Sequence, residues 1–310
     1  MSTAIYSHPD CLLHDMGDWH PESPARLQAI EDQLILARLD GLVERRLAPL
    51  AEVPAILRNH TEEALALVRD NIPDTPGETY PLDADTHLCH ASYDAALRGA
   101  GAALAATDAV IAGEIDNAFC ATRPPGHHAT PGQPMGFCLF NNVAIAALHA
   151  LESHGLERVA IIDFDVHHGN GTEASFRDDP RVLMASFFQH PYYPGTPPQP
   201  ITATNVNVPL PARSGGDIVR QVVEEYWLPA LHAHRPQMIF ISAGFDAHRD
   251  DDMGGMALVE ADYAWITRQI MSVAREHAGG RIVSCLEGGY ELSALGRSVV
   301  AHLKVLAELD

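Results

Sequence analysis

Residues 161–172 read Ile-Ile-Asp-Phe-Asp-Val-His-His-Gly-Asn-Gly-Thr, and the interpretation of the rest of the chain starts from them. The apolar run 159–162 predicts a buried strand that ends in an Asp-x-Asp-x-His-His pattern. Side chains alternate along a strand, so Asp163, Asp165 and His167 should point to one side. Two carboxylates and an imidazole cannot be buried there without a partner, and a divalent metal, zinc or ferrous iron, is the simplest one. The alternative is a pair of helix-capping aspartates followed by surface histidines.

Length and composition indicate a large globular protein. The chain has 310 residues, of which 46% are hydrophobic, and this is enough for one α/β core. We expect no apolar run that approaches the roughly 18 residues needed to span a bilayer, and no signal peptide is visible at the N-terminus. Five dispersed cysteines without a CxxC pair predict reduced thiols and therefore a cytoplasmic location.

The charge balance is strongly acidic, with a formal net charge of −21 from 41 acidic and 20 basic residues. Such a surface should repel nucleic acid and anionic membranes, so we expect neither as a partner. It favours cationic partners such as lysine-rich peptides or polyamines. The alternative is that the acidity serves only solubility.

Strands and helices are expected to alternate along the chain. Hydrophobic patterns predict strands at 3–7, 118–122, 159–164, 182–187, 238–242 and 282–286. Helices are predicted at 24–39, after Thr61, at 92–113, 141–154, 217–234 and 259–277, and at the C-terminus. Ser23 should cap the first helix, with Leu27, Ile30, Leu34 and Ile35 on its buried face. Residues 71–85 read as a long surface loop.

This alternation predicts one α/β domain, residues 1–310, with a mostly parallel central sheet and helices on both faces. Ligands bind beyond the carboxyl ends of the strands in such sheets. Four polar clusters follow strand ends, at Arg123–His128, Asp163–His168, Asp246 and Glu287–Tyr290. We expect them to converge on one rim and form a site.

The chemistry of these clusters suits a hydrolytic metal centre. Asp165, His167 and Asp246 would supply two carboxylates and one imidazole and leave a coordination position open. Two anionic ligands weaken the activation of water, so a separate general base is needed, and His127 or His128 could serve. A chance His-His pair is the alternative.

Two further residues have candidate roles at the same rim. Tyr290 follows two glycines and could donate a hydrogen bond to a developing oxyanion, unless it is an ordinary turn tyrosine. Asp163 could orient a histidine, bind a monovalent cation or cap a helix. The chain has no GxSxG elbow, P-loop, HExxH or GxGxxG after a strand, which argues against those chemistries.

The combined motifs resemble the histone deacetylase superfamily of the arginase–deacetylase fold, in its class II and bacterial amidohydrolase branch. The resemblance covers nearly the whole chain. It rests on the segments His20–Arg26, Arg123–His128, Gly136–Cys138, Asp163–Thr172, Ala243–Asp246 and Glu287–Tyr290. It implies a zinc-dependent amidohydrolase, with ferrous iron as an alternative metal, that removes acetyl groups from lysine side chains.

The resemblance also implies a role for each matching residue. The implied metal ligands are Asp165, His167 and Asp246. The implied catalytic residues are His127, His128, Asp163, Asn170 and Tyr290, with His128 as general base and acid. The implied substrate-contacting residues are Asp85, Gly136, Phe137, Tyr193 and Met253. Arg26 matches an arginine of an internal product channel. A structural potassium site matches Asp163, Asp165, His167, Ser186 and Phe187.

Two departures from the family pattern lie around the substrate entrance. Residues 250–253 read Asp-Asp-Asp-Met where the family often has Gly-Asp-Pro-Leu, and Tyr193 stands where phenylalanine is common. Both departures bear on substrate choice more than on chemistry. An acetylated polyamine is therefore the alternative to an acetylated lysine peptide or protein: Met253 disfavours it, whereas Asp251 and Asp252 leave it open. A non-catalytic acyl-lysine-binding module is a further alternative, and homo-oligomerisation is left open.

Overall fold

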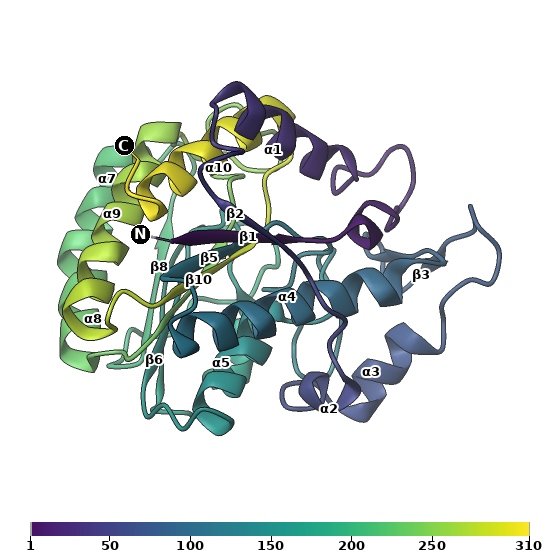
Figure 1. Cartoon of the computed structure of the whole chain (residues 1–310), viewed down its shortest axis with the longest axis horizontal. Coiled ribbons are helices and arrows are strands. Elements are labelled where there is room, and N and C mark those ends of the chain that lie inside the picture. Colours follow the sequence, from purple (N-terminus) through teal and green to yellow (C-terminus); the bar gives the residue numbers. More distant parts are fainter. Residues whose placement is uncertain (1, 310) are drawn as a thin grey trace.

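A parallel sheet forms the centre of the protein, as the computed structural model of residues 2–309 shows (Figure 1). Its eight strands are arranged in the order β2-β1-β5-β10-β9-β6-β7-β8, and every pair is parallel. The strands are β1 (Thr3–Ser7), β2 (Glu44–Leu47), β5 (Asn117–Cys120), β6 (Val159–Asp163), β7 (Val182–Gln189), β8 (Asn205–Leu210), β9 (Ile239–Ala243) and β10 (Ile282–Leu286). A two-residue antiparallel pair, β3 (Tyr80–Pro81) and β4 (His87–Leu88), lies outside the sheet. The predicted fold class is confirmed.

Helices cover both faces of the sheet (Figure 1). They are α1 (Ala25–Leu36), α2 (Val53–Ile56), α3 (Glu62–Arg69), α4 (Ser92–Ala112), α5 (Asn142–Glu152), α6 (Asn170–Phe176), α7 (Gly216–Val222), α8 (Leu228–His234), α9 (Glu260–His277) and α10 (Leu292–Leu306), with a short 3-10 helix at Pro9–Leu12. Alternate residues of β6 enter different cores: Ile161 belongs to the core that includes residues of α4 and α5, and Ile162 belongs to the core that includes residues of α1, α9 and α10. This alternation explains why the strand sequence is apolar throughout.

The structure corrects the predicted strands. Sequence analysis missed β2 and β8, which are the two edge strands of the sheet. Edge strands face solvent along one side, and their sequences, Glu-Arg-Arg-Leu and Asn-Val-Asn-Val-Pro-Leu, lack the apolar run that marked the central strands.

The predicted helices also need correction. Pro24, not Ser23, occupies the N-cap position of α1, and no side-chain cap forms there. Ile35 is 60% exposed, whereas the other three predicted positions of that helix are buried. The predicted helix 217–234 is interrupted by a π-helical turn at Val223–Trp227.

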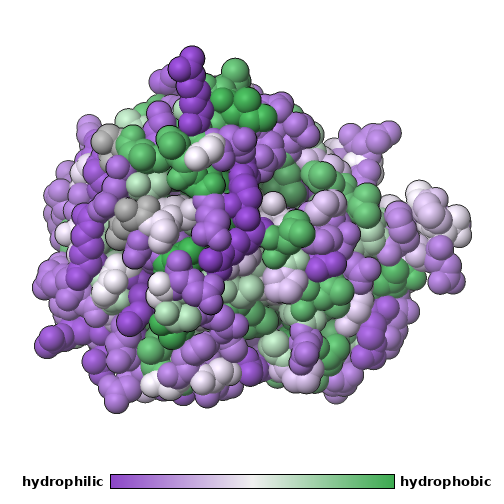
Figure 2. Space-filling view, viewed as in Figure 1, coloured by the Kyte–Doolittle hydropathy of each residue, from purple (hydrophilic) through white to green (hydrophobic). Residues whose placement is uncertain are grey.

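Helix α4 contradicts the expectation about bilayer-spanning runs. By length and composition alone this helix is apolar enough to cross a membrane, but 67% of the relevant window is buried inside the protein. Its alanines and glycines let it approach its neighbours closely; a Cβ on Gly101 would lie 2.0 Å from the Pro49 carbonyl oxygen. The helix is therefore a core element of this fold. Figure 2 shows a mostly hydrophilic face interrupted by separate hydrophobic patches.

Two buried histidines are held in the neutral state by burial, and their hydrogen bonds determine which ring nitrogen carries the proton. Thr267 Oγ1 donates to the Tyr263 carbonyl oxygen at 2.7 Å, so it accepts from His302 Nδ1, also at 2.7 Å. The Asn141 N–H donates to His60 Nε2 at 2.9 Å, which leaves the proton on Nδ1, 3.0 Å from the Thr130 carbonyl oxygen. Burial lowers the pKa of His302 to about 3 and that of His60 to about 4.

These histidines predict a loss of stability in mild acid. Because both pKa values are lower in the folded than in the unfolded chain, the unfolded state binds more protons below the ordinary histidine pKa of about 6.5. Each histidine should lower the free energy of unfolding by about 1.4 kcal/mol per pH unit between about pH 6 and pH 4.5. Urea unfolding across this range should give a shallower slope for His302→Gln than for the native chain; equal slopes would contradict the assignment.

Candidate active site

Four neighbouring strands deliver polar side chains to one rim of the sheet. The strands β5, β10, β9 and β6 are consecutive in the sheet order, and each of the four predicted polar clusters follows one of them. Because all the strands are parallel, their carboxyl ends meet at the same edge. The sequence segments that looked separate therefore form one group of side chains.

The three predicted metal ligands lie within contact distance of one another. His167 Nδ1 is 3.0 Å from Asp165 Oδ1 and 3.2 Å from Asp246 Oδ2. One ligand atom from each of the three residues lies within 4.8 Å of the others, and all three residues are buried. They come from the loops after β6 and β9, so tertiary structure, not local sequence, completes the set.

Backbone groups hold the two carboxylates in place. Asp165 Oδ2 accepts the Gly288 N–H at 2.8 Å, and Asp246 Oδ1 accepts the Val166 N–H at 2.9 Å. A Cβ on Gly288 would lie 2.0 Å from Asp246 Oδ2 and 2.6 Å from Asp165 Oδ2. Glycine is therefore required at position 288 for the chain to pass this close to the carboxylates.

These residues fit a divalent metal. Asp246 Oδ2 is buried and accepts no hydrogen bond, although every other oxygen of the two ligand carboxylates does. Burial and the neighbouring Asp165 raise the pKa of Asp246 to about 7 even though His167 Nδ1 lies 3.2 Å from its Oδ2, so a nearby cation would stabilise the ionised carboxylate. Two carboxylates and one imidazole are a donor set that suits zinc or ferrous iron.

The adjacent histidines have different partners. His127 Nδ1 lies 2.9 Å from Asp163 Oδ2, a carboxylate, whereas His128 Nδ1 lies 2.7 Å from Asn170 Oδ1, a neutral amide oxygen. Their rings are 4.0 Å apart. Because the amide oxygen only accepts, His128 carries its proton on Nδ1 and leaves Nε2 unprotonated.

Electrostatics separates the two histidines further. Burial alone would lower the pKa of His127, but Asp165 and Asp163 outweigh burial and raise this pKa well above its ordinary value. Burial, and after it the positive charge of the adjacent His127, lower the pKa of His128 well below its ordinary value. The arrangement thus pairs a charged imidazole with a neutral one, a division suited to general base catalysis by His128.

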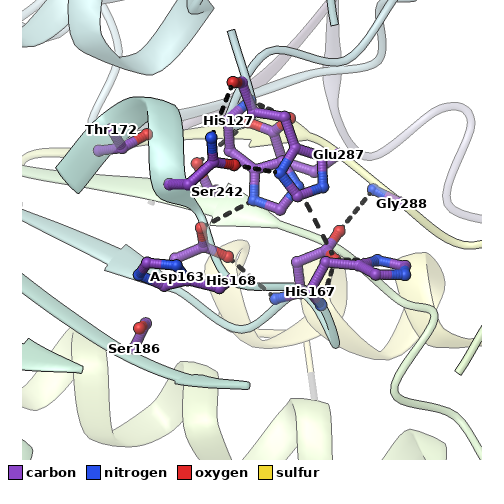
Figure 3. A network of polar contacts seen from close by, with 12 residues as sticks. His127, Asp163, His167, His168, Thr172, Ser186, Ser242, Glu287 and Gly288 are labelled. Carbon is purple, nitrogen blue, oxygen red and sulfur yellow. Dashed lines mark hydrogen bonds and ion pairs between the residues drawn. The ribbon is translucent and has the colours of Figure 1, made fainter. Parts of the chain in front are cut away.

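Glu287 joins the sheet to the loop that carries His127 and His128, a role that sequence analysis did not assign. Its Oε2 accepts the N–H groups of Gly126 and His127 at 2.6 and 3.0 Å, and its Oε1 accepts the Ser242 hydroxyl at 3.0 Å. Figure 3 shows this network between His127 and the strand ends. The sequence feature that could have indicated this role is the carboxylate directly after β10, a strand that is buried throughout.

Tyr290 is fixed from two directions. Asp251 Oδ2 accepts the N–H groups of Tyr290 and Glu291 at 2.6 and 2.9 Å. The Arg26 guanidinium lies 4.9 Å from the centre of the Tyr290 ring and donates to the Gly289 carbonyl oxygen at 2.6 Å. Asp251 is buried, so it does not belong to an acidic entrance rim, whereas its neighbours Asp250 and Asp252 are both exposed.

A buried ion-pair group lies behind this segment. Glu22 contacts Arg26 and Arg123 at 3.0 and 2.5 Å, and all three side chains are fully buried. The two guanidinium groups overcome the effect of burial and lower the pKa of Glu22 to about 2. Arg26 thus supports Tyr290; a product channel beside it stays a prediction.

A cavity of about 130 Å³ opens above these groups. It is lined by Asp85, His128, Gly136, Phe137, His167, Tyr192, Tyr193, Met253 and Tyr290. The structure therefore brings all five predicted substrate-contacting residues to one cavity and adds Tyr192, whose ring stacks on His167 at 5.5 Å.

Backbone strain shapes one wall of this cavity. Gly136 and Phe137 both have left-handed backbone conformations, with φ of 57° and 66°. A Cβ on Gly136 would lie 2.6 Å from the His128 ring, so only glycine fits. Phe137 tolerates this conformation while its N–H donates to Thr86 Oγ1 at 3.1 Å and its ring packs 5.9 Å from that of Tyr290.

Comparison with known proteins identifies the family. The histone deacetylase domain matches residues 20–306. The chain belongs to the histone deacetylase family. It is 39% identical to a probable deacetylase of Archaeoglobus fulgidus over 100% of this chain and 86% of that protein. It is also 39% identical to a histone deacetylase-like amidohydrolase of Pseudomonas aeruginosa over 91% of this chain and 77% of that one.

A solved structure supports the same conclusion for the fold. The crystal structure of the HDA15 HD domain matches with a TM-score of 0.92 and 33% identity, over 99% of this chain and 90% of that chain. The predicted resemblance to histone deacetylases is thereby confirmed, and the protein is placed in a deacetylase and amidohydrolase family whose members are generally metal-dependent. The individual roles of the site residues stay predictions.

The position of Asp251 in this histone deacetylase domain gives a paired test. Asp251→Asn keeps the shape but turns an amide N–H toward backbone N–H groups, because Oδ1 accepts from Met253 while Oδ2 accepts from Tyr290 and Glu291. Urea unfolding should show a loss of about 1–3 kcal/mol for this variant. The exposed neighbour is the control, and Asp252→Asn should change stability by less than about 0.5 kcal/mol. Equal effects would contradict the role of Asp251.

Proposed function

We propose that this protein is a zinc-dependent amidohydrolase that removes acetyl groups from lysine side chains of peptides or proteins. The observation that carries the proposal is the buried cluster of Asp165, His167 and Asp246, whose His167 lines the same cavity as His128 and Tyr290. Relatives named deacetylase and histone deacetylase-like amidohydrolase support the reaction class. Ferrous iron is the alternative metal for the same ligands.

The chain's own residues supply proton transfer and charge stabilisation. His128, which lines the cavity and has an unprotonated Nε2, takes a proton from the attacking water and returns it to the departing amine. His127, held charged by Asp163, stabilises the negative charge that develops beside it. The Tyr290 hydroxyl, whose pKa burial raises well above its ordinary value, stays protonated and donates to the carbonyl oxygen as it becomes an oxyanion.

Asp165, His167 and Asp246 would hold the metal. When bound, it supplies Lewis-acid polarisation of the amide carbonyl and lowers the pKa of water. His128 would still be needed as a base, since two carboxylate ligands would reduce the charge available for water activation. Asp163 and Ser186 are partners in the β6–β7 register, and this supports a structural potassium site completed by Asp165, His167 and Phe187.

The cavity supports lysine over polyamine substrates. Phe137 and Tyr193 present aromatic walls suited to the methylene chain of an acyl-lysine, and Met253 adds an apolar lining. The burial of Asp251 removes one of the two carboxylates that would have drawn a polycation to the entrance. Asp85, which also lines the cavity, would bind the substrate backbone. The dispersed free cysteines support a cytoplasmic location as part of the same proposal.

Turnover of an acetyl-lysine peptide tests this proposal. The purified protein should hydrolyse the peptide, lose activity on chelation and recover it with zinc. An acetylated polyamine assayed alongside should be the poorer substrate. No turnover by zinc-loaded protein would contradict the enzyme assignment, and faster polyamine turnover would overturn the choice of lysine.

Tyr290→Phe isolates the oxyanion donor. Removing one such donor should lower kcat by about 10²- to 10³-fold, because the hydrogen bond strengthens in the transition state. Zinc content and the binding of substrate should change little, because the phenol is not a ligand. Unchanged kcat in this variant would exclude the role.

A further inference from the structure

A second group of metal-ligating side chains lies on the surface. Asp108 belongs to α4, His149 to α5, and His154 to the turn that follows α5. Asp108 Oδ1 is 2.6 Å from His149 Nε2 and 2.7 Å from His154 Nε2. His154 precedes the amino end of β6, so this group lies near the amino ends of the strands. The candidate active site lies at their carboxyl ends.

We propose that Asp108, His149 and His154 form a peripheral site for a divalent transition metal such as zinc. Three ligand atoms from three separate segments already converge within 4.8 Å. Two imidazoles and one carboxylate are donors that zinc accepts, and a bound water can complete a tetrahedral site. A dication would replace the two Nε2 protons that now point at one carboxylate oxygen.

The surroundings favour a cation that arrives from solvent. Asp108 is 55% exposed and His154 26%, while His149 is 15% exposed and anchored against the protein. Asp108 and His149 lie near the carboxyl ends of α4 and α5, where the helix dipole creates negative potential. A metal here would tie the ends of these two helices together.

Arg58 opposes metal binding and so provides a distinctive test. Its Nη1 lies 2.6 Å from His149 Nδ1. A guanidinium only donates, so this contact keeps the His149 proton on Nε2, the atom that a metal would bind. With a metal on Nε2, the proton would move to Nδ1, which could then no longer accept from Arg58. Binding therefore requires Arg58 to leave, and Glu152, whose Oε2 is 3.9 Å from Arg58 Nε, offers it another partner.

A similar group at His232, Glu276 and His277 serves as the control. There the two imidazoles contact each other at 2.9 Å, and Glu276 faces them with different oxygens at 3.5 and 3.4 Å. The contacts to the two rings are also longer than those of Asp108. This group is less well arranged for one metal than the proposed site.

Zinc binding to the full-length protein, measured by equilibrium dialysis and metal analysis, tests the proposal. The native chain should bind one equivalent more than His154→Gln, in which affinity at this site should fall at least about tenfold. Arg58→Ala should bind that equivalent more tightly, a gain that misfolding cannot imitate. His232→Gln should bind as the native chain does, and deacetylase turnover of His154→Gln should be unchanged.

The two metal sites can be distinguished in the same measurement. Asp246→Ala should lose the equivalent held in the candidate active site and keep the peripheral one. Equal zinc in the native chain and His154→Gln, weaker binding by Arg58→Ala, or loss of the additional equivalent in His232→Gln would each overturn the peripheral site.

Discussion

The burial of several carboxylates at adjacent strand ends is the constraint on which this structure depends. Asp163, Asp165, Asp246 and Glu287 are each essentially inaccessible to solvent, and all four meet at one rim. Uncompensated charge of this density is costly in a protein interior. The fold offsets it with directed backbone N–H groups and with the charged His127, and the candidate ligands Asp165, His167 and Asp246 could accept a divalent cation.

Many local features follow from that constraint. Gly288 is glycine because no Cβ fits beside the two ligand carboxylates, and Glu287 holds the loop that presents His127 and His128. Asp251 and Arg26 then fix Tyr290 from the other side. The result is a set of side chains whose positions are determined before a substrate binds, which is the condition for electrostatic catalysis.

Sequence reasoning recovered the parts of the fold that have strong local patterns. The apolar run before Asp163 identified β6, and the polar residues after β5, β6, β9 and β10 indicated one rim because parallel strands share an edge. The half-exposed edge strands β2 and β8 carried no such pattern. The supporting contacts of Asp251 and Glu287 could not be predicted, because each depends on pairing between segments 39 or more positions apart. The family resemblance named the cavity residues except Tyr192, and the three-dimensional arrangement was needed to show that they share one cavity.

The most direct test of the account is a crystal structure of the zinc-loaded protein with anomalous data at the zinc edge. The account predicts an anomalous peak bounded by Asp165, His167 and Asp246, about 2.0–2.2 Å from each ligand atom. No peak there in a crystal that contains zinc elsewhere would contradict the claim that these buried carboxylates are arranged around a metal.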